Sequence, residues 1–173
     1  PPIRPVPQTS VFPYAFLLDE WFSRFTMHNL TPQQKRKARI ITLQVNYAQE
    51  FQGSEMDATF DNMLDPDDMP EADVINYSKH LCSLTIQHLH EMDEIIKKRS
   101  KNWDLERITI IDRLILRISL SEMLYEDEVP PKVSITEGVE IAKQFSTSDS
   151  SSFINGILDA VYNDLIKGKE KTV

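Results

Sequence analysis

Four cationic side chains gather near the start of the first long helical pattern of the chain. They belong to the run Lys35-Arg36-Lys37-Ala38-Arg39. Cations oppose the dipole at the start of a helix, which favours acidic residues in the first turn, and a local rule broken in this way indicates a function. At helical spacing, the polar stripe that starts here comprises Lys35, Arg39, Thr42, Asn46 and Gln49, with Tyr47 on its flank.

This combination of side chains suits single-stranded RNA. Cations attract phosphates, amides bond base edges, and an aromatic ring stacks on a base. An ordinary solvated helix face is the competing interpretation and the more common one, because short basic runs are frequent in soluble proteins. The stripe therefore indicates an RNA-binding surface without excluding a surface that has no function.

The other side chains that could do chemistry form no site. The sequence contains no glycine-rich phosphate loop and no G-x-S-x-G, H-E-x-x-H or C-x-x-C motif. One helix face cannot present His80, His88 and His90 together to a metal ion. The paired carboxylates of Asp67 and Asp68 lie in an acidic stretch that water should solvate. We therefore predict a protein that is not an enzyme and that holds no metal and no cofactor.

Two further polar features fall within apolar helical patterns. Gly156 stands in mid-helix beside Ser152, Asn155 and Asp159, and glycine there costs roughly 1 kcal/mol relative to alanine. We therefore expect something to approach the backbone at Gly156, either a neighbouring helix or, less simply, RNA or a partner protein.

Charged residues also occur inside the most apolar helical pattern, where charges are usually paired. These are Arg117 and Glu122, and Glu137 lies on the following helix. We expect Arg117 to pair with Glu122 or with Glu137.

A series of helices must position these residues. The first begins with Thr31 as cap and Pro32 in the first position and ends at Gly53, with a wide apolar face that includes Tyr47 and Phe51. Apolar residues at a period of about 3.6 indicate that the others follow. We expect them over residues 57–64, 70–101, 108–125 and 131–145, and from about 149 to 165.

Composition agrees with an all-α protein. The chain has 173 residues, which suits one domain, and contains only four glycines. Its net charge of −8 argues against a globally basic nucleic-acid binder but leaves room for a local patch. Charges interrupt each apolar run before the roughly 20 residues that span a membrane. A single cysteine, Cys82, fits a reducing compartment, so we expect a cytoplasmic protein without a membrane segment.

The first thirty residues differ from the rest. Residues 1–13 hold five of the ten prolines, and six of the fifteen aromatic residues lie between positions 12 and 25. We expect an N-terminal extension over residues 1–30, which is Pro-rich and then forms a short aromatic helix. One domain over residues 31–166 and a frayed tail over 167–173 should follow.

Four segments in this order resemble the NusB family of transcription antitermination factors. They are KRKARIITLQVNY at 35–47, NWDLERITIIDRLILRISLSE at 102–122, PPKVSITEGVEIAKQF at 130–145 and DSSSFINGILD at 149–159. The resemblance implies an all-helical fold of two packed helical subdomains. It also implies binding to the boxA element of ribosomal RNA leader transcripts together with the ribosomal protein NusE, within the antitermination complex of RNA polymerase.

The resemblance also implies roles for individual residues. Carried over by position, the RNA-binding residues are Lys35, Arg36, Lys37, Arg39, Tyr47, Asp112, Asp149 and Phe153. The chain departs from the family pattern where Ser146 replaces the usual glycine and where Val45-Asn46 replaces Ala-Leu.

Two alternatives remain open at this point. NusB-like domains also occur at the N-terminus of RNA cytosine methyltransferases, of which this chain would be a fragment. The Pro- and aromatic-rich N-terminus could instead belong to a protein-interaction module that does not bind RNA. We expect a monomer or a weak homodimer.

Overall fold

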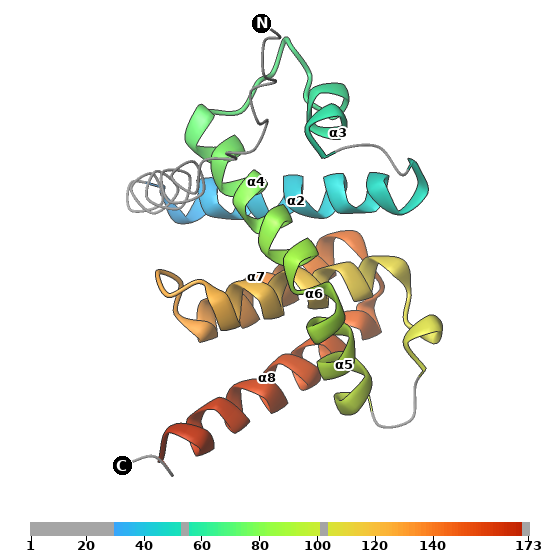
Figure 1. Ribbon diagram of the computed structural model, residues 1–173, viewed down its shortest axis with the longest axis vertical. Coiled ribbons are helices and arrows are strands. Elements are labelled where there is room, and N and C mark those ends of the chain that lie inside the picture. Colours follow the sequence, from blue (N-terminus) through green and yellow to red (C-terminus); the bar gives the residue numbers. More distant parts are fainter. Residues whose placement is uncertain (1–29, 53–55, 101–103, 171–173) are drawn as a thin grey trace, which may run out of the picture.

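The computed structural model describes residues 30–52, 56–100 and 104–170, and every long element in these ranges is a helix (Figure 1). The elements are α2 (Pro32–Gln52), α3 (Met56–Met63), α4 (Ala72–Gln87), α5 (Leu89–Arg99), the 3₁₀ helix η1 (Leu105–Arg107), α6 (Ile110–Tyr125), α7 (Pro131–Phe145) and α8 (Ser148–Glu170). The all-α prediction is confirmed. The predicted N-terminal extension lies outside the described residues, apart from Leu30, and so does the end of the tail, 171–173.

The start of α2 follows the predicted capping signal. The Thr31 hydroxyl accepts a hydrogen bond from the backbone N–H of Gln34 at 3.2 Å, and the Gln34 side chain accepts one from the N–H of Thr31 at 2.9 Å. This reciprocal pair is a capping box, which satisfies two N–H groups that the helix leaves unpaired.

The prediction of one long helix over residues 70–101 is wrong, because the chain forms two helices there, α4 and α5. His88 separates α4 from α5 with backbone angles of −107° and 16°, outside the α-helical range. The backbone N–H of His88 still bonds the carbonyl of Leu84, so the chain turns without losing that bond. The break lets α5 pack against α6 and α8.

Apolar side chains form two cores. In the first core, α2, α3 and α4 meet through Ala38, Val45, Phe60, Tyr77 and Leu81. The second joins α5, α6, α7 and α8, and α2 contributes Leu43 to it; other members include Met92, Ile96, Leu116, Leu120, Ile154 and Leu158. This arrangement confirms the expected fold of two packed helical subdomains. No helix of the described part is long and apolar enough to cross a membrane.

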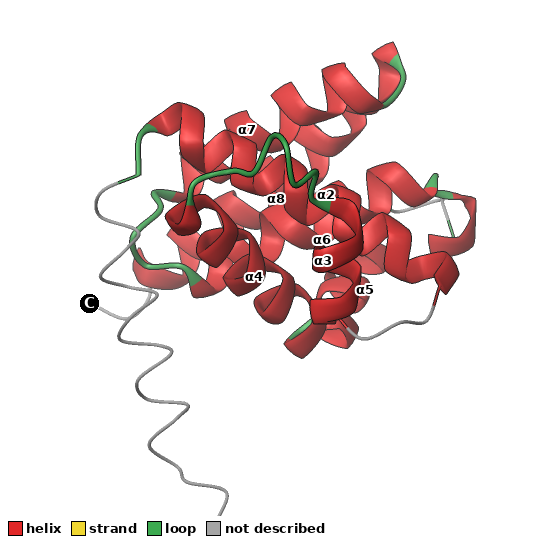
Figure 2. Cartoon of the chain, turned by 90° about the horizontal axis from the view of Figure 1, so that it is seen from above, coloured by secondary structure: helices red, strands yellow, loops and turns green. Residues whose placement is uncertain are grey.

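Contacts between charged and polar residues fix the directions of the helices. The beginning of α2 meets the end of α6 through Arg39 and Glu122, while Glu50 near the end of α2 meets Arg117. The two helices therefore run antiparallel. In turn, α7 runs back along α6, because Ser134 near its beginning bonds Glu122 and Ser146 just beyond its end bonds Asp112. Figure 2 shows the helices from above.

The two mid-helix glycines have different surroundings. A Cβ atom on Gly138 would lie 2.5 Å from the Oγ atom of Ser119, so glycine there allows α7 to approach α6 closely. A Cβ atom on Gly156 would meet nothing within 4 Å. The prediction that a neighbouring helix packs closely on Gly156 is therefore wrong within the described residues, and the position that needs glycine is Gly138.

Candidate functional site

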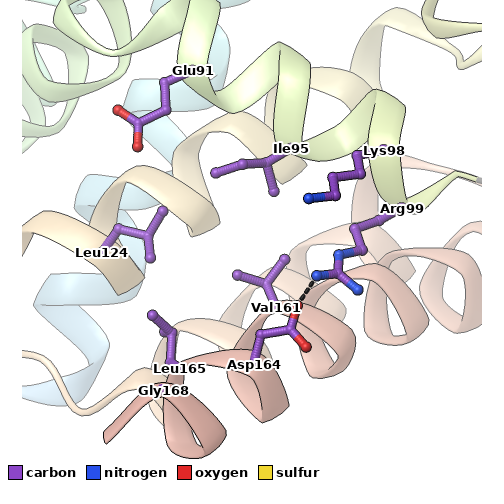
Figure 3. Close-up of a pocket in the computed structure, with 9 residues that line it drawn as sticks. All are labelled: Glu91, Ile95, Lys98, Arg99, Leu124, Val161, Asp164, Leu165 and Gly168. Atoms are coloured by element: carbon purple, nitrogen blue, oxygen red, sulfur yellow. Dashed lines mark ion pairs between the residues drawn. The ribbon is translucent and has the colours of Figure 1, made fainter. Parts of the chain in front are cut away.

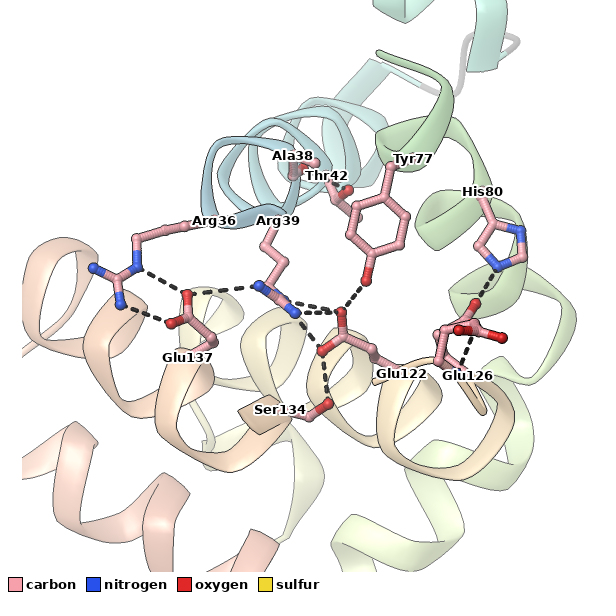
Figure 4. Close-up of polar contacts among 11 residues, drawn as sticks. Arg36, Ala38, Arg39, Thr42, Tyr77, His80, Glu122, Glu126, Ser134 and Glu137 are labelled. Carbon is pink, nitrogen blue, oxygen red and sulfur yellow. Dashed lines mark hydrogen bonds and ion pairs between the residues drawn. The ribbon is translucent and has the colours of Figure 1, made fainter. Parts of the chain in front are cut away.

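A buried ionic cluster lies where α2, α4, α6 and α7 meet (Figure 4). Arg39 is only 3% exposed, and its Nε atom donates to both carboxylate oxygens of Glu122, at 2.9 and 3.1 Å. The hydroxyl groups of Tyr77 and Ser134 donate to the same carboxylate, the latter at 2.6 Å. The carboxylate of Glu122 is thus surrounded by donors from three other helices.

Electrostatics in this cluster favour the ionised arginine and the neutral phenol. Burial lowers the pKa of Arg39, but Glu122, Tyr77 and Glu137 together outweigh that effect and hold the pKa above its ordinary value. Burial, followed by the charge of Glu122, raises the pKa of Tyr77. Removing either Arg39 or Glu122 would leave the charge of the other uncompensated in the interior, which costs about 3–5 kcal/mol.

The predicted polar stripe of α2 therefore does not lie on the surface in its middle part, while Lys35 and Gln49 at its two ends are half-buried. Arg39, Thr42 and Asn46 are all buried. The Thr42 hydroxyl contacts the carbonyl groups of Ala38 and Ser78, so this side of α2 packs against α4 as well as α6. In this arrangement the guanidinium of Arg39 points into the protein, where Glu122 occupies it, and does not present its charge at the surface.

The remaining cations at the beginning of α2 do reach the surface. Arg36 has a side chain that is 47% exposed, and it forms a bidentate pair with Glu137 through bonds of 2.8 and 2.7 Å. This hydrogen bonding raises the pKa of Arg36. Lys37 is exposed and Lys35 half-buried, and neither forms an ion pair with another residue in the described part of the chain.

A different stripe of α2 faces solvent. Gln44 is exposed in the middle of the helix, and Tyr47 and Phe51 are exposed near its end. The prediction of an inward apolar face that includes both rings is therefore wrong. Sequence reasoning missed Phe51 as a surface residue, because an apolar side chain at helical spacing is usually part of a core.

The prediction that Arg117 pairs with Glu122 or Glu137 is also wrong. Its guanidinium donates to both oxygens of Asp93 at 2.7 and 2.8 Å and to Glu50 at 3.0 Å. Arg117 and Glu122 stand five residues apart on one helix, which places them well around its circumference from each other. Glu122 instead pairs with Arg39.

Asp112 faces the interior rather than solvent. It is 5% exposed, and its two carboxylate oxygens accept hydrogen bonds from the hydroxyl groups of Ser146, at 2.6 Å, and Ser150, at 2.8 Å. The carboxylate therefore holds the turn between α7 and α8. Asp149 is exposed beside this turn, whereas Phe153 is half-buried and packs on the second core.

The predicted site residues thus divide into two groups. The cations lie at the beginning of α2, where Arg36 meets α7. Asp112 and Asp149 lie at the other end of α6 and α7, near the end of α2, because Glu50 bonds Arg117 there and approaches Arg113 at 4.0 Å. The exposed stripe of α2 extends between the two groups.

A protein-family model described as the NusB family matches residues 36–163. The chain belongs to the NusB family. The match spans both cores and includes all the predicted site residues except Lys35. The resemblance noted from four sequence segments is therefore confirmed.

Known NusB proteins support this assignment at the levels of sequence and fold. The transcription antitermination protein NusB of Chloroherpeton thalassium is 40% identical over 131 residues, which are 76% of this chain and 62% of that protein. The chain thus matches less than two thirds of that relative. A solved structure of T. maritima NusB is 28% identical, with a TM-score of 0.66, and the match covers 76% of this chain and 90% of that one.

A third similar protein is a component of a larger assembly. It comes from a crystal structure of the antitermination factors NusB and NusE in complex with dsRNA. It is 22% identical with a TM-score of 0.69, and the match covers 78% of this chain and 99% of that one. At this identity the likeness shows the NusB fold alone.

One more surface feature of this NusB-family chain is a groove between α5, α6 and α8 (Figure 3). Its volume is about 650 Å³, and Ile95, Leu124 and Leu165 line it. Lys98 also lines it, and Arg99 pairs with Asp164 across one side. The described residues contain no cluster of His, Cys, Asp and Glu that could hold a metal ion, in this groove or elsewhere. The groove is thus an apolar surface with a charged edge.

Proposed function

We propose that this NusB-family protein is a non-enzymatic, RNA-binding transcription antitermination factor. It acts in the cytoplasm on the single-stranded boxA element of ribosomal RNA leader transcripts, together with the ribosomal protein NusE. The observation that carries this proposal is the group of cations Lys35, Arg36 and Lys37 at the beginning of α2. From Lys37, the exposed side of the helix continues into polar and aromatic side chains.

The charge distribution supports RNA as the ligand. The whole chain carries a net charge of −8, so its average field repels a polyanion. Lys35 and Lys37 are not neutralised by carboxylates within the described part, and Arg36 can exchange Glu137 for a phosphate at the surface. Binding by so few cations should be weak. The slope of log K against the logarithm of the salt concentration should be about −0.7 per phosphate contact.

Weak binding by one small patch favours a second protein in the complex. One solved structure supports NusE as this partner, because in it a protein of the same fold is in complex with NusE and dsRNA. NusE would add its own contacts to the RNA, and linked contacts raise the apparent affinity. The RNA polymerase antitermination complex is the wider assembly in which the pair acts.

The predicted site residues take different roles in this proposal. Lys35, Arg36 and Lys37 bind phosphates, Tyr47 stacks on a base, and Asp149 and Phe153 lie beside the RNA. Arg39 and Asp112 do not touch the RNA in this proposal but hold in place the elements that do. Arg39 holds α2 against α6 and α7, and Asp112 holds the turn that carries Asp149.

The experiment measures the Kd of boxA-type RNA with and without NusE. The triple variant Lys35→Gln, Arg36→Gln, Lys37→Gln should lose most of its affinity. The slope of log K against the logarithm of the salt concentration should become shallower by about 2, since three phosphate contacts disappear. The matched control is Lys97→Gln, Lys98→Gln, Lys143→Gln, which changes net charge equally at three other exposed lysines. If the first variant binds RNA as tightly as the parent, the proposed site is wrong.

A further inference from the structure

Two aromatic rings lie side by side in solvent near the end of α2. Phe51 is 64% exposed and Tyr47 is 42% exposed, one helical turn apart. Their ring centroids are separated by 5.1 Å, and the ring planes are tilted by 56°. Because the rings are tilted rather than stacked face to face, each keeps a face that another flat group can cover.

These rings lie on the same side of α2 as the exposed cation Lys37. Lys37, Gln44, Tyr47 and Phe51 follow one another at intervals of seven, three and four residues, which places them on one side of a helix. At 1.5 Å per residue the line from Lys37 to Phe51 is about 21 Å long. A chain of alternating phosphates and bases could thus follow α2 from its charged beginning to its aromatic end.

We propose that Phe51 is a second base-stacking residue, which extends the platform of Tyr47 along this exposed side of α2. The ligand is single-stranded RNA, with one base on each ring. This inference rests on the proposed function and deepens it, because it adds a residue that binds bases rather than phosphates.

The charges around Phe51 favour a nucleic acid over a protein. The nearest acidic residue in sequence, Glu50, bonds Arg117 at 3.0 Å, so its charge is compensated where RNA would pass. The stripe itself alternates cationic, amide and aromatic side chains. A protein interface would instead centre on a continuous apolar patch that is depleted in charge. Single-stranded nucleic-acid sites combine cations with aromatic rings in the way seen here.

The first test compares two substitutions of Phe51, with NusE present and boxA-type single-stranded RNA as the probe. Phe51→Leu keeps an apolar side chain but removes the flat ring, and we expect the Kd to rise at least roughly fivefold, the lower limit for the loss of one stacked base. Phe51→Trp keeps a ring and should bind at least as tightly as the parent. The salt dependence should not change in either variant, because no phosphate contact is lost.

Two controls separate stacking from other effects. Met69→Leu changes another exposed apolar residue and should leave the Kd unchanged. Scanning single abasic sites through the RNA should locate one position whose base matters to the parent and no longer matters to Phe51→Leu. Such non-additivity is the mark of two groups in direct contact.

Other outcomes would overturn the inference. If Phe51→Leu binds RNA as tightly as the parent, Phe51 stacks on no base, although the proposed function stands. The same holds if Phe51→Leu weakens NusE binding in the absence of RNA or changes the mass of the protein in solution, because the ring then covers a protein surface. If the parent and the control with altered Lys97, Lys98 and Lys143 do not bind RNA at all, the proposed function and this inference both fail.

Discussion

Arg39 and Glu122 connect the two cores of the protein from positions 83 residues apart. The Nη2 atom of the arginine lies 2.9 Å from the Oε1 atom of the glutamate, and both side chains are almost completely buried. Their pairing explains why a cationic residue next to the surface cations points inward. A substitution of Arg39 therefore reports on the stability of the fold rather than on a contact with RNA.

Replacing Arg39 should destabilise the fold. In Arg39→Met the Glu122 carboxylate loses its counter-charge, and we expect the free energy of unfolding to fall by about 3–5 kcal/mol. Denaturation in urea measures this change. Arg36→Met is the matched control, because a half-exposed pair such as Arg36 with Glu137 contributes about 0–1 kcal/mol. Equal losses from both variants would contradict the structural role assigned to Arg39.

The hydrogen bonds to Asp112 give a second prediction. Ser146→Gly restores the residue usual in the family but removes the donor that lies 2.6 Å from the Asp112 carboxylate. We expect the free energy of unfolding to fall by about 1–3 kcal/mol, the range for hydrogen bonds to charged groups and for unsatisfied buried acceptors. Ser152→Gly, at an exposed position of α8, controls for the effect of glycine itself. A larger loss in the control than in Ser146→Gly would show that the bond to Asp112 contributes nothing.

The two glycines predict opposite effects of the same substitution. Gly138→Ala places a Cβ atom 2.5 Å from Ser119 Oγ, and overpacking of this kind costs about 1–3 kcal/mol. Gly156→Ala meets open space in a helix and should stabilise the protein by about 0.4–1 kcal/mol. Thermal unfolding of the two variants checks both signs. Adding Ser119→Ala to Gly138→Ala should recover part of the loss, and no recovery would mean that the strain lies elsewhere.

The buried thiol of Cys82 predicts a dependence on alkaline pH. Burial raises the pKa of Cys82 from 9.0 to about 12, so the folded protein holds this proton more tightly than the unfolded chain does. The contribution to stability is therefore complete below pH 9 and is lost as the pH rises towards about 12. Urea denaturation across this range should show a steeper loss for the parent than for Cys82→Ala. A thiol reagent should likewise modify the unfolded chain much faster than the folded one.

Periodicity and motif order predicted the helical architecture well because both are local properties. The capping box at Thr31 and the proline that opens α7 are visible in a few residues, and the structure confirms the helices that they start. The break at His88 could not be predicted, because neither glycine nor proline marks it. It follows from the packing of α5 on α6 and α8, which involves residues far away in sequence.

The sequence did not show which side of α2 is buried. Both sides of the helix mix polar and apolar residues, so spacing alone could not show which stripe is buried. The buried stripe is the one whose polar groups find partners: Arg39 meets Glu122, and Thr42 meets the carbonyl of Ser78. These partners come from other helices, so only the tertiary structure could reveal that Phe51 and Gln44 are exposed.

The helix α2 supplies Leu43 to one core and Ala38 and Val45 to the other. It is therefore clamped along most of its length, and it cannot bend or shift without disturbing both halves of the molecule. The side chains on its outer side are consequently held at fixed distances from one another. A ligand that follows this helix would be selected by how well the spacing of its own charges and rings matches those distances.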